Sequence, residues 1–222
     1  MGYTNSSLIS KTKLSPNHYN GRNAIIGVTP HCYVGKATLD GAASWLGNPS
    51  SNASANYYID ADGKIILLVE EKNGAWTSSS YANDMSRITI ECASGSTDPY
   101  EFPEPTYLSL IKLVADIHKR NGLTKATWND DPKNPGTITA HYFFKNKACP
   151  GAWFRNKLNS GEFCKKVNEI LNPTPKPTPA PVSTPPTTAS TSTSSRSPWS
   201  ATELTSSSAS TKWTSAQLQR IS

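Results

Sequence analysis

The stretch RITIEC, residues 87–92, decides the fold, because polar and apolar side chains alternate along its length. A period of two is typical of a β-strand, in which successive side chains point to opposite faces of the sheet. Ile88, Ile90 and Cys92 therefore share one face of this strand. Glu91 lies on the other face, and it points toward a cleft if the isoleucine face packs in the core.

Other strand-like and helical segments lie on both sides of this strand. Strand-like runs cover residues 24–28, 56–59 and 64–69. The dipeptide Asp62-Gly63 is typical of a hairpin turn. Apolar residues at helical spacing cover residues 38–46, 106–121 and 161–171, and Gly122 lies where a C-terminal cap is expected. Strands interspersed with helices predict an α/β fold with a mixed β-sheet flanked by helices.

Composition and charge limit the classes of partner. The chain has 222 residues, 36% of them hydrophobic, and a net charge of +6. This hydrophobic content is low for a protein folded from end to end, so we expect part of the chain to be disordered. The positive charge favours a polyanionic partner, and nucleic acid, an anionic membrane and a wall polymer such as teichoic acid all stay open on composition alone.

Neither a signal peptide nor a membrane span is recognisable in the sequence. The N-terminal residues MGYTNSSLISKTK lack an apolar core, and no run of about 18 apolar residues follows. We therefore expect a chain that is synthesised in the cytoplasm without a signal peptide and has no stable membrane association.

A change in composition near residue 173 predicts the domain organisation. Residues 173–197 form a Pro/Thr/Ser tract, which is typical of an extended, disordered linker. We predict a catalytic domain over residues 1–172, a linker over 173–197 and a short low-complexity tail over 198–222. The tail is interpreted as the stub of a truncated wall-binding module.

Two histidines and a cysteine are candidate metal ligands. His141 and Cys149 bracket a loop that ends at Pro150-Gly151, and His31 follows a strand-like run. Zinc binds imidazole nitrogen and thiolate sulfur, and catalytic sites use three protein ligands so that the fourth position can hold water. The spacing of His141 and Cys149 is not that of a zinc finger, so buried structural roles for these residues stay open on spacing alone.

The other histidines and cysteines are interpreted as structural. His18 lies in a polar loop, and His118 falls beside the apolar stripe of a predicted helix. Cys32, Cys92 and Cys164 are assigned to structural positions. Wide spacing favours free or metal-bound thiols, although an even number of cysteines leaves a disulfide open.

Four motifs, in this order, resemble a known family. They are VTPHC at 28–32, SANYYIDADGKI at 54–65, NDMSRITIECA at 83–93 and HYFFKNKACPG at 141–151. With these motifs the chain resembles the zinc-dependent N-acetylmuramoyl-L-alanine amidases of the Amidase_2 or peptidoglycan-recognition type. The closest likeness is to the amidase domains of phage endolysins and clostridial wall hydrolases, and it covers about residues 5–171.

The resemblance implies an enzyme and a set of site residues. Such amidases cut the amide between N-acetylmuramic acid and L-alanine in peptidoglycan with a zinc-activated water. It implies that His31, His141 and Cys149 bind Zn²⁺. It also implies that Glu91 is the general acid/base and that Lys147 stabilises the oxyanion. A solvent-facing carboxylate and a surface lysine are the alternatives for these two residues.

One branch of the family carries a catalytic tyrosine, and this sequence departs from it. Ala55 occupies the matching position, so a tyrosine-assisted mechanism is not expected. Tyr57 and Tyr58 are adjacent in a predicted strand, so at most one of them faces a groove. A polar loop that contains Trp76, Asn83 and Asp84 is a candidate for glycopeptide binding.

Three functions compete on the sequence. The favoured one is a peptidoglycan amidase, which reaches the cell wall after phage or prophage lysis or by non-classical export. Its partners are expected to be peptidoglycan and anionic wall polymers, and not nucleic acid. The second is a non-catalytic peptidoglycan-binding module, which typically lacks the cysteine ligand that Cys149 would provide. The third is a cysteine hydrolase with Cys149 as nucleophile and His141 as base.

Overall fold

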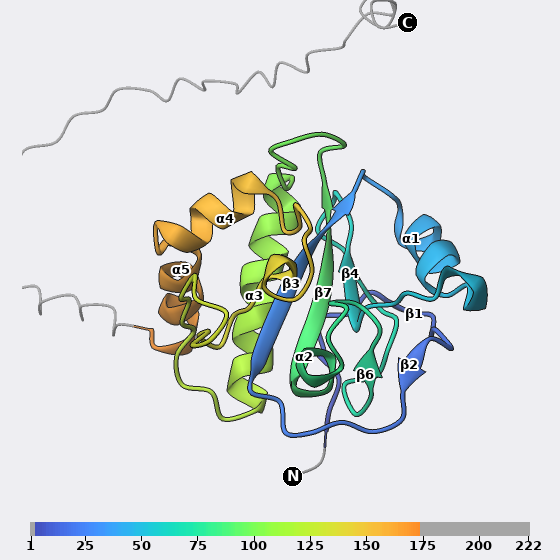
Figure 1. Ribbon diagram of the computed structural model, residues 1–222, viewed down its shortest axis with the longest axis horizontal. Coiled ribbons are helices and arrows are strands. Elements are labelled where there is room, and N and C mark those ends of the chain that lie inside the picture. The colour runs from blue at the N-terminus through green and yellow to red at the C-terminus, as the bar shows by residue number, and fades with distance from the viewer. Residues whose placement is uncertain (1–2, 174–222) are drawn as a thin grey trace, which may run out of the picture. The chain divides into compact units, whose positions relative to one another are not determined.

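A mixed β-sheet forms the centre of the computed structural model, which describes residues 3–173 (Figure 1). The strands of this sheet are β1 (Lys11–Thr12), β3 (Gly27–Val34), β4 (Tyr57–Ile59), β5 (Ile65–Leu67) and β7 (Arg87–Ser94). They lie in the order β1-β5-β4-β7-β3. Strands β4 and β5 pair antiparallel, whereas β1 with β5, β4 with β7, and β3 with β7 pair parallel. A separate two-stranded sheet joins β2 (His18–Tyr19) to β6 (Gly74–Ala75).

Helices cover both faces of the central sheet. They are α1 (Leu39–Leu46), α2 (Tyr81–Ser86), α3 (Glu104–Arg120), α4 (Ala152–Asn159) and α5 (Glu162–Leu171), with the short 3-10 helices η1 (Pro49–Ser51) and η2 (His141–Phe143). In Figure 1, α3, α4 and α5 lie to the left of the strands and α1 lies to the right. The predicted α/β fold, a mixed sheet flanked by helices, is confirmed.

The alternation in β7 divides the core into two clusters. Ile88 and Ile90 lie in a large apolar cluster with residues of α3, α4 and α5. Ala93, on the opposite face, packs in a smaller cluster with α1. Glu91 lies on the same side as Ala93, because their positions differ by two residues. The strand therefore directs Glu91 away from the main core, as the isoleucine pattern predicts.

Strand β3 begins three residues later than predicted and ends six residues later. The predicted strand covers residues 24–28, with His31 beyond its end, whereas the structure places His31 inside β3. Pro30 obscures the pattern, since proline lacks the N–H that a strand normally donates. β3 lies at the edge of the sheet, where proline is tolerated.

The prediction of a polar loop around Trp76, Asn83 and Asp84, at residues 72–84, was wrong. The segment contains β6 and most of α2. Asp84 accepts hydrogen bonds from the backbone N–H groups of Thr77 and Ser78, at 3.1 Å for the shortest contact with each residue. The Asp84 side chain thereby connects the short helix to the preceding residues. Sequence analysis detects helices by an apolar repeat, and this helix does not depend on one.

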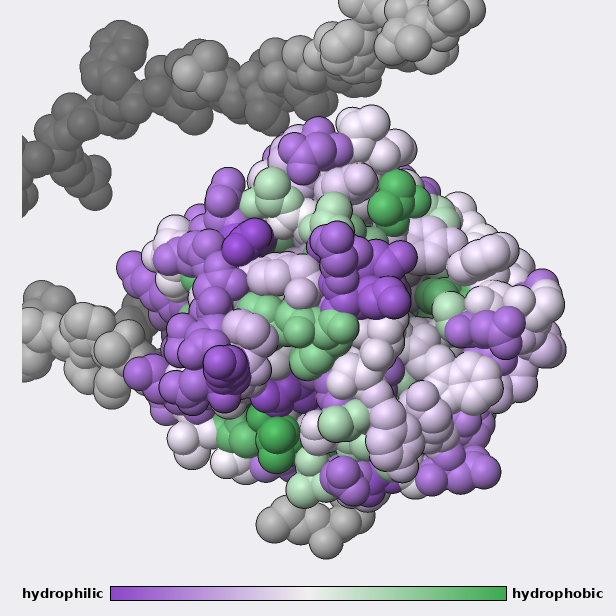
Figure 2. All heavy atoms as spheres, in the orientation of Figure 1, coloured by the Kyte–Doolittle hydropathy of each residue, from purple (hydrophilic) through white to green (hydrophobic). Residues whose placement is uncertain are grey.

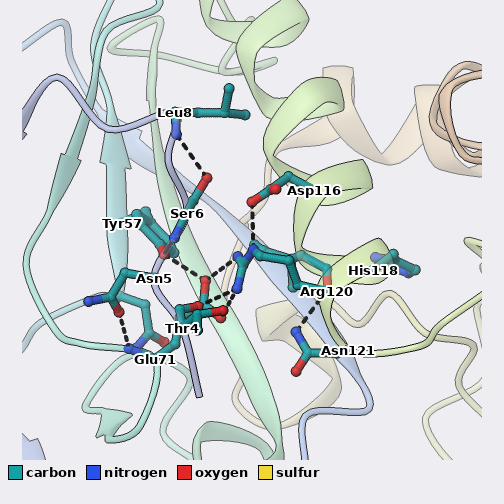
Figure 3. A network of polar contacts seen from close by, with 12 residues as sticks. Thr4, Asn5, Ser6, Leu8, Tyr57, Glu71, Asp116, His118, Arg120 and Asn121 are labelled. Atoms are coloured by element: carbon teal, nitrogen blue, oxygen red, sulfur yellow. Dashed lines mark hydrogen bonds and ion pairs between the residues drawn. The ribbon is translucent and has the colours of Figure 1, made fainter. Parts of the chain in front are cut away.

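A buried ion pair fastens the N-terminal segment to α3 (Figure 3). Glu71 is fully buried, and its Oε1 lies 2.6 Å from Arg120 Nη2. Tyr57 Oη donates to the same carboxylate at 2.6 Å and accepts from the Ser6 N–H at 2.9 Å. Arg120 also donates to the Thr4 carbonyl. Because charges are costly to bury unpaired, this network fixes the start of the chain against the helix.

The remaining sequence predictions on domain organisation extend beyond the described residues. The predicted catalytic domain, residues 1–172, is described from residue 3 onward. Apart from Pro173, the predicted linker and tail lie outside the part of the chain that the structure describes. No helix between residues 3 and 173 is both long and apolar enough to cross a bilayer.

Candidate metal centre

Three possible metal ligands from distant parts of the chain meet at the edge of the sheet. His31 lies in β3, His141 begins η2, and Cys149 lies in the loop between η2 and α4. One ligand atom from each residue lies within 4.8 Å of the other two. Cys149 Sγ is 3.3 Å from His31 Nδ1, and the centroids of the two imidazole rings are 4.9 Å apart. The structure thus brings together the ligand set that the sequence predicts.

Backbone hydrogen bonds to β3 place His141 beside His31. The Val28 N–H donates to the Thr137 carbonyl at 2.9 Å, and the Thr139 N–H donates to the Val28 carbonyl at 3.1 Å. Residues 137–139 therefore run alongside the edge strand. His141 follows two residues later, as the first residue of η2.

A glycine holds the cysteine loop in position. Gly151 has φ of 89°, a backbone conformation that residues with a Cβ rarely adopt. A Cβ at this position would lie 2.9 Å from the Pro99 carbonyl oxygen and 2.8 Å from Tyr100 Cβ. The glycine lets the chain pass close to residues 99–100 two positions after Cys149.

The donor set fits a metal ion that takes nitrogen and sulfur ligands. Ligand atoms around a tetrahedral ion of this kind lie about 3.5 Å apart, given metal–ligand distances of about 2.0–2.3 Å. The 3.3 Å separation of Cys149 Sγ and His31 Nδ1 matches this value. His31 Nε2 is buried and finds no hydrogen-bond partner among the described residues. Nδ1 of His31 and Sγ of Cys149 are therefore the atoms placed to share an ion, and Nε2 of the same ring would not be the ligand.

The environment keeps the imidazoles in the form that binds metals. Burial, followed by the neighbouring His141, lowers the pKa of His31 well below its ordinary value. Burial and the charge of Lys147 lower the pKa of His141 to about 4. Burial raises the pKa of the Cys149 thiol well above its ordinary value. Both histidines are therefore neutral at pH 7, and a metal ion must displace a proton from the thiol to bind it.

Glu91 and Lys147 line the same pocket as two of the three ligands. This open pocket of about 340 Å³ is lined by Cys32, Val34, Glu91, Tyr100, His141, Lys147, Ala148 and Cys149. Glu91 pairs with His31 in the register of β7 and β3, so the two side chains share one face of the sheet. Burial raises the pKa of Glu91 to about 8. Its Oε2 atom is buried without a hydrogen-bond partner within residues 3–173.

The comparison with protein families identifies the group to which the chain belongs. Residues 21–152 match the model of the Amidase_2 family, described as N-acetylmuramoyl-L-alanine amidase. The chain belongs to this family. N-acetylmuramoyl-L-alanine amidase A of Achromobacter lyticus is 30% identical over 129 residues, which cover 57% of this chain and 68% of that protein. These findings confirm the resemblance and the enzyme class expected from the sequence.

Solved structures share the fold of this amidase. The hydrolase AmiA of Staphylococcus aureus, solved in complex with its ligand, matches with a TM-score of 0.55 and 18% identity, covering 72% of this chain and 82% of that chain. PlyL matches with a TM-score of 0.53 and 12% identity, covering 72% and 95% of the two chains. An AmpD derivative matches with a TM-score of 0.52 and 18% identity, covering 72% and 98%. At these identities the likeness shows the fold alone.

The tyrosines of β4 lie in the two cores of the amidase and not in the groove. Tyr57 and Tyr58 are both fully buried. Tyr57 donates its hydroxyl hydrogen to Glu71, and Tyr58 donates its own to the Ala37 carbonyl at 2.7 Å. Neither tyrosine therefore faces a groove, which agrees with the predicted limit of at most one, and both hydroxyls are satisfied inside the fold. Ala55, at the position of the family tyrosine, is buried as well.

The histidines and cysteines assigned structural roles lie away from the ligand set, with one exception. His118 is buried and bonded to the Val114 carbonyl and to Thr137, and His18 lies in β2. Cys92 lies in the main core and Cys164 packs against it. Cys32 is part of the same core but also lines the pocket beside Cys149. All four cysteines of the amidase are free, so the structure contains no disulfide.

Sequence reasoning missed Ser79 and the full extent of a second pocket. Ser79 Oγ lies 3.5 Å from His141 Nε2. It also lines an open pocket of about 470 Å³, whose walls are Tyr19, Asn52, Ala53, Trp76, Thr77, Ser79, Ser80, Tyr81 and Asp84. Trp76 and Asp84 were candidates from the sequence, whereas Asn83 does not line this pocket. A serine in a Ser-rich segment carries no sequence signal that distinguishes it from its neighbours.

Proposed function

We propose that this amidase hydrolyses the amide bond between N-acetylmuramic acid and L-alanine of bacterial peptidoglycan with a water activated by Zn²⁺. His31, His141 and Cys149 would hold the ion. The observation that carries the proposal is the meeting of these three ligands beside an open pocket that is lined by Glu91 and by two of them, His141 and Cys149. A bound zinc ion would lower the pKa of a water molecule toward about 7 and polarise the amide carbonyl.

Glu91 is proposed to transfer the proton. In the reaction a water oxygen bonds to the carbonyl carbon, the carbon–nitrogen bond breaks, and a proton moves from the water to the leaving nitrogen. The products are a lactyl carboxylate and a peptide with a free N-terminal L-alanine. A general acid/base works best with a pKa near the working pH, and burial raises the pKa of Glu91 to about 8 in the metal-free protein. The orphaned Oε2 atom leaves this carboxyl free to accept and return a proton.

Lys147 is proposed to stabilise the negative charge that develops on the carbonyl oxygen. Lys147 lines the pocket with His141 and Cys149, and its charge contributes to the lowered pKa of His141. Preorganised positive charge near a developing oxyanion lowers the barrier of acyl transfer reactions. Lys145 lies in the same loop but does not line this pocket, so the proposed role is assigned to Lys147 alone.

The second pocket is proposed to bind another part of the muropeptide. Ser79 connects it to the ligand set, since its hydroxyl approaches His141. Tyr19 contacts Trp76 and Tyr81, with ring centroids 5.8 Å and 4.8 Å apart. Aromatic side chains beside hydroxyl groups suit an extended ligand that carries both apolar and polar surfaces. Figure 2 shows that the face of the molecule viewed in Figure 1 is mainly polar, with separate apolar patches.

The amidase is also proposed to act on the wall after release from the cytoplasm, with anionic wall polymers as secondary partners. The net charge of +6 supports attraction to such polymers. This attraction would weaken with added salt, because salt screens exposed charges.

Chelation tests the proposed chemistry and separates it from its two competitors. Dialysis against a chelator should abolish the release of free N-terminal L-alanine from purified walls, and Zn²⁺ should restore it. A cysteine hydrolase with Cys149 as nucleophile would keep its activity without metal. A non-catalytic binding module would release no alanine before or after the treatment. Full activity in metal-free protein would therefore refute the proposal.

A further inference from the structure

A closed ring of three hydrogen bonds joins β3, α2 and the segment that precedes η2. Asn83 Nδ2 donates to Thr29 Oγ1 at 3.0 Å, and Thr139 Oγ1 donates to Asn83 Oδ1 at 3.1 Å. The ring closes between Thr29 Oγ1 and Thr139 Oγ1, which are 2.8 Å apart. All three residues are buried, with exposed fractions of 5% for Asn83, 0% for Thr29 and 1% for Thr139. If Thr29 donates to Thr139, each hydroxyl both donates and accepts once.

The ring joins the segments that carry the two histidines. Thr29 precedes His31 by two residues in β3, so the side chains of both residues point to the same face of the sheet. Thr139 precedes His141 by two residues. Asn83, in α2, is the only member of the ring that belongs to neither segment.

We infer that Asn83 is a positioning residue that sets the distance between His31 and His141. Within residues 3–173, Asn83 is the one residue of a third element whose side chain hydrogen-bonds to both Thr29 and Thr139. Hydrogen bonds that hold metal ligands from behind pre-organise them, and loss of such bonds weakens metal binding. Backbone hydrogen bonds between Val28 and residues 137–139 fix the register of this segment along β3. The side-chain ring would then fix how closely the segment packs against the strand.

The element that carries Asn83 is itself fixed to the loop beside His141. Asp84, the next residue in α2, binds the backbone of Thr77 and Ser78, and Ser79 follows with its hydroxyl near His141. Helix α2 is therefore linked indirectly to the ligands in two ways, through the Asn83 ring and through the loop that Asp84 holds. Neither residue offers an atom to the proposed ion, so both act through other residues.

The experiment measures zinc affinity in the full chain, and the inference rests on the proposed metal site. Zn²⁺ dissociation constants are obtained by competition with a chromophoric chelator, and Co²⁺ absorption spectra report on the geometry of the site. Asn83→Ala should weaken zinc binding roughly 10-fold, at the lower end of what loss of supporting hydrogen bonds costs a metal site. The cobalt spectrum should change shape, because the imidazoles are no longer held at one distance.

Asn17→Ala is the matched control. Asn17 is 3% exposed, and its Nδ2 donates to the Asn48 and Ala53 carbonyls and to Ser51. None of these partners lies in a segment that carries a candidate ligand. This variant loses a buried asparagine of similar exposure and should keep the zinc affinity of the native chain within about twofold, since its bonds are remote from the ligands.

Two further variants keep the test decisive if Asn83→Ala fails to fold. Thr139→Val removes the hydroxyl at nearly constant volume and should also weaken zinc binding, whereas Thr139→Ser retains the hydroxyl and should restore it. Because both single changes break the same ring, Asn83→Ala with Thr139→Val should cost less than the two single costs combined.

The outcomes separate this inference from the proposed function. Failure of the native chain to bind one equivalent of Zn²⁺ would overturn the metal site, and the positioning role with it. A native chain that binds zinc, with folded Asn83→Ala and Thr139→Val variants that bind it as tightly as Asn17→Ala does, would overturn the positioning role alone.

Discussion

Replacing Glu91 with glutamine should remove activity and at the same time stabilise the metal-free protein. The pKa of Glu91 is raised by burial to about 8 from an ordinary value of 4.5. A carboxyl group whose pKa is raised by folding destabilises the folded protein once the pH exceeds its pKa in the unfolded chain. Above that pH the unfolded chain releases a proton that the folded chain keeps. The window of this effect runs from pH 4.5 to pH 8.

The magnitude follows from the width of that window. In the unfolded chain the pKa of Glu91 is 4.5, so pH 7 lies 2.5 units above it. Each of these units lowers the free energy of unfolding by about 1.4 kcal/mol. Glu91 therefore costs roughly 3 kcal/mol at pH 7, and glutamine, which carries no charge at any pH, should recover much of this. Proton transfer by a positioned side chain contributes about 10²- to 10⁴-fold to rates, so turnover should fall by at least about 100-fold.

The assay compares unfolding by urea at pH 5 and pH 7.5 in chelator-treated protein, alongside alanine release by the zinc-loaded forms. Glu91→Gln should be clearly more stable than the native chain at pH 7.5 and close to it at pH 5, with zinc content unchanged in the loaded protein. Equal stability of the two chains at both pH values would refute the electrostatic reasoning. A near-normal rate in the variant would remove Glu91 from catalysis.

Two further predictions concern buried charges and histidines elsewhere in the fold. Arg120→Met should cost about 3–5 kcal/mol of unfolding free energy, because it leaves the fully buried Glu71 unpaired; urea unfolding checks this, and a loss below about 1 kcal/mol would contradict the buried network. Burial lowers the pKa of His118, so the native chain should lose stability as pH falls below about 6.5, the value in the unfolded chain. His118→Gln should show a smaller loss between pH 7.5 and pH 5.5, and an identical loss in both chains would rule out a titrating role for His118.

Regular elements with a strong apolar repeat were predictable from the sequence. The run at residues 87–92 alternates strictly, and the structure has a strand there that extends to Ser94. The helix predicted at 106–121 is α3, and apolar residues at helical spacing line its buried face. In both cases burial of one continuous face determines the structure, and this leaves a pattern in the residue types.

Elements held by single polar contacts were not predictable. α2 depends on Asp84 and on its N-cap Ser80, and β3 contains a proline that masks its extended conformation. The same limit applies to the site. The ligand set at His31, His141 and Cys149 followed from motifs that resemble a family, since their spacing along the chain does not encode a distance in space. Ser79 approaches His141, and Asn83 hydrogen-bonds to Thr29. These contacts can be seen only once the position of α2 in the fold is known.

X-ray absorption at the zinc edge tests most directly whether two imidazoles and one thiolate share a single ion. The account predicts, for the zinc-loaded full chain, nitrogen or oxygen ligands at about 2.0–2.1 Å and one sulfur ligand at about 2.3 Å in a four-coordinate shell. Cys149→Ser should remove the sulfur contribution. A native spectrum without sulfur, or a six-coordinate shell of oxygen ligands, would contradict the proposed metal centre.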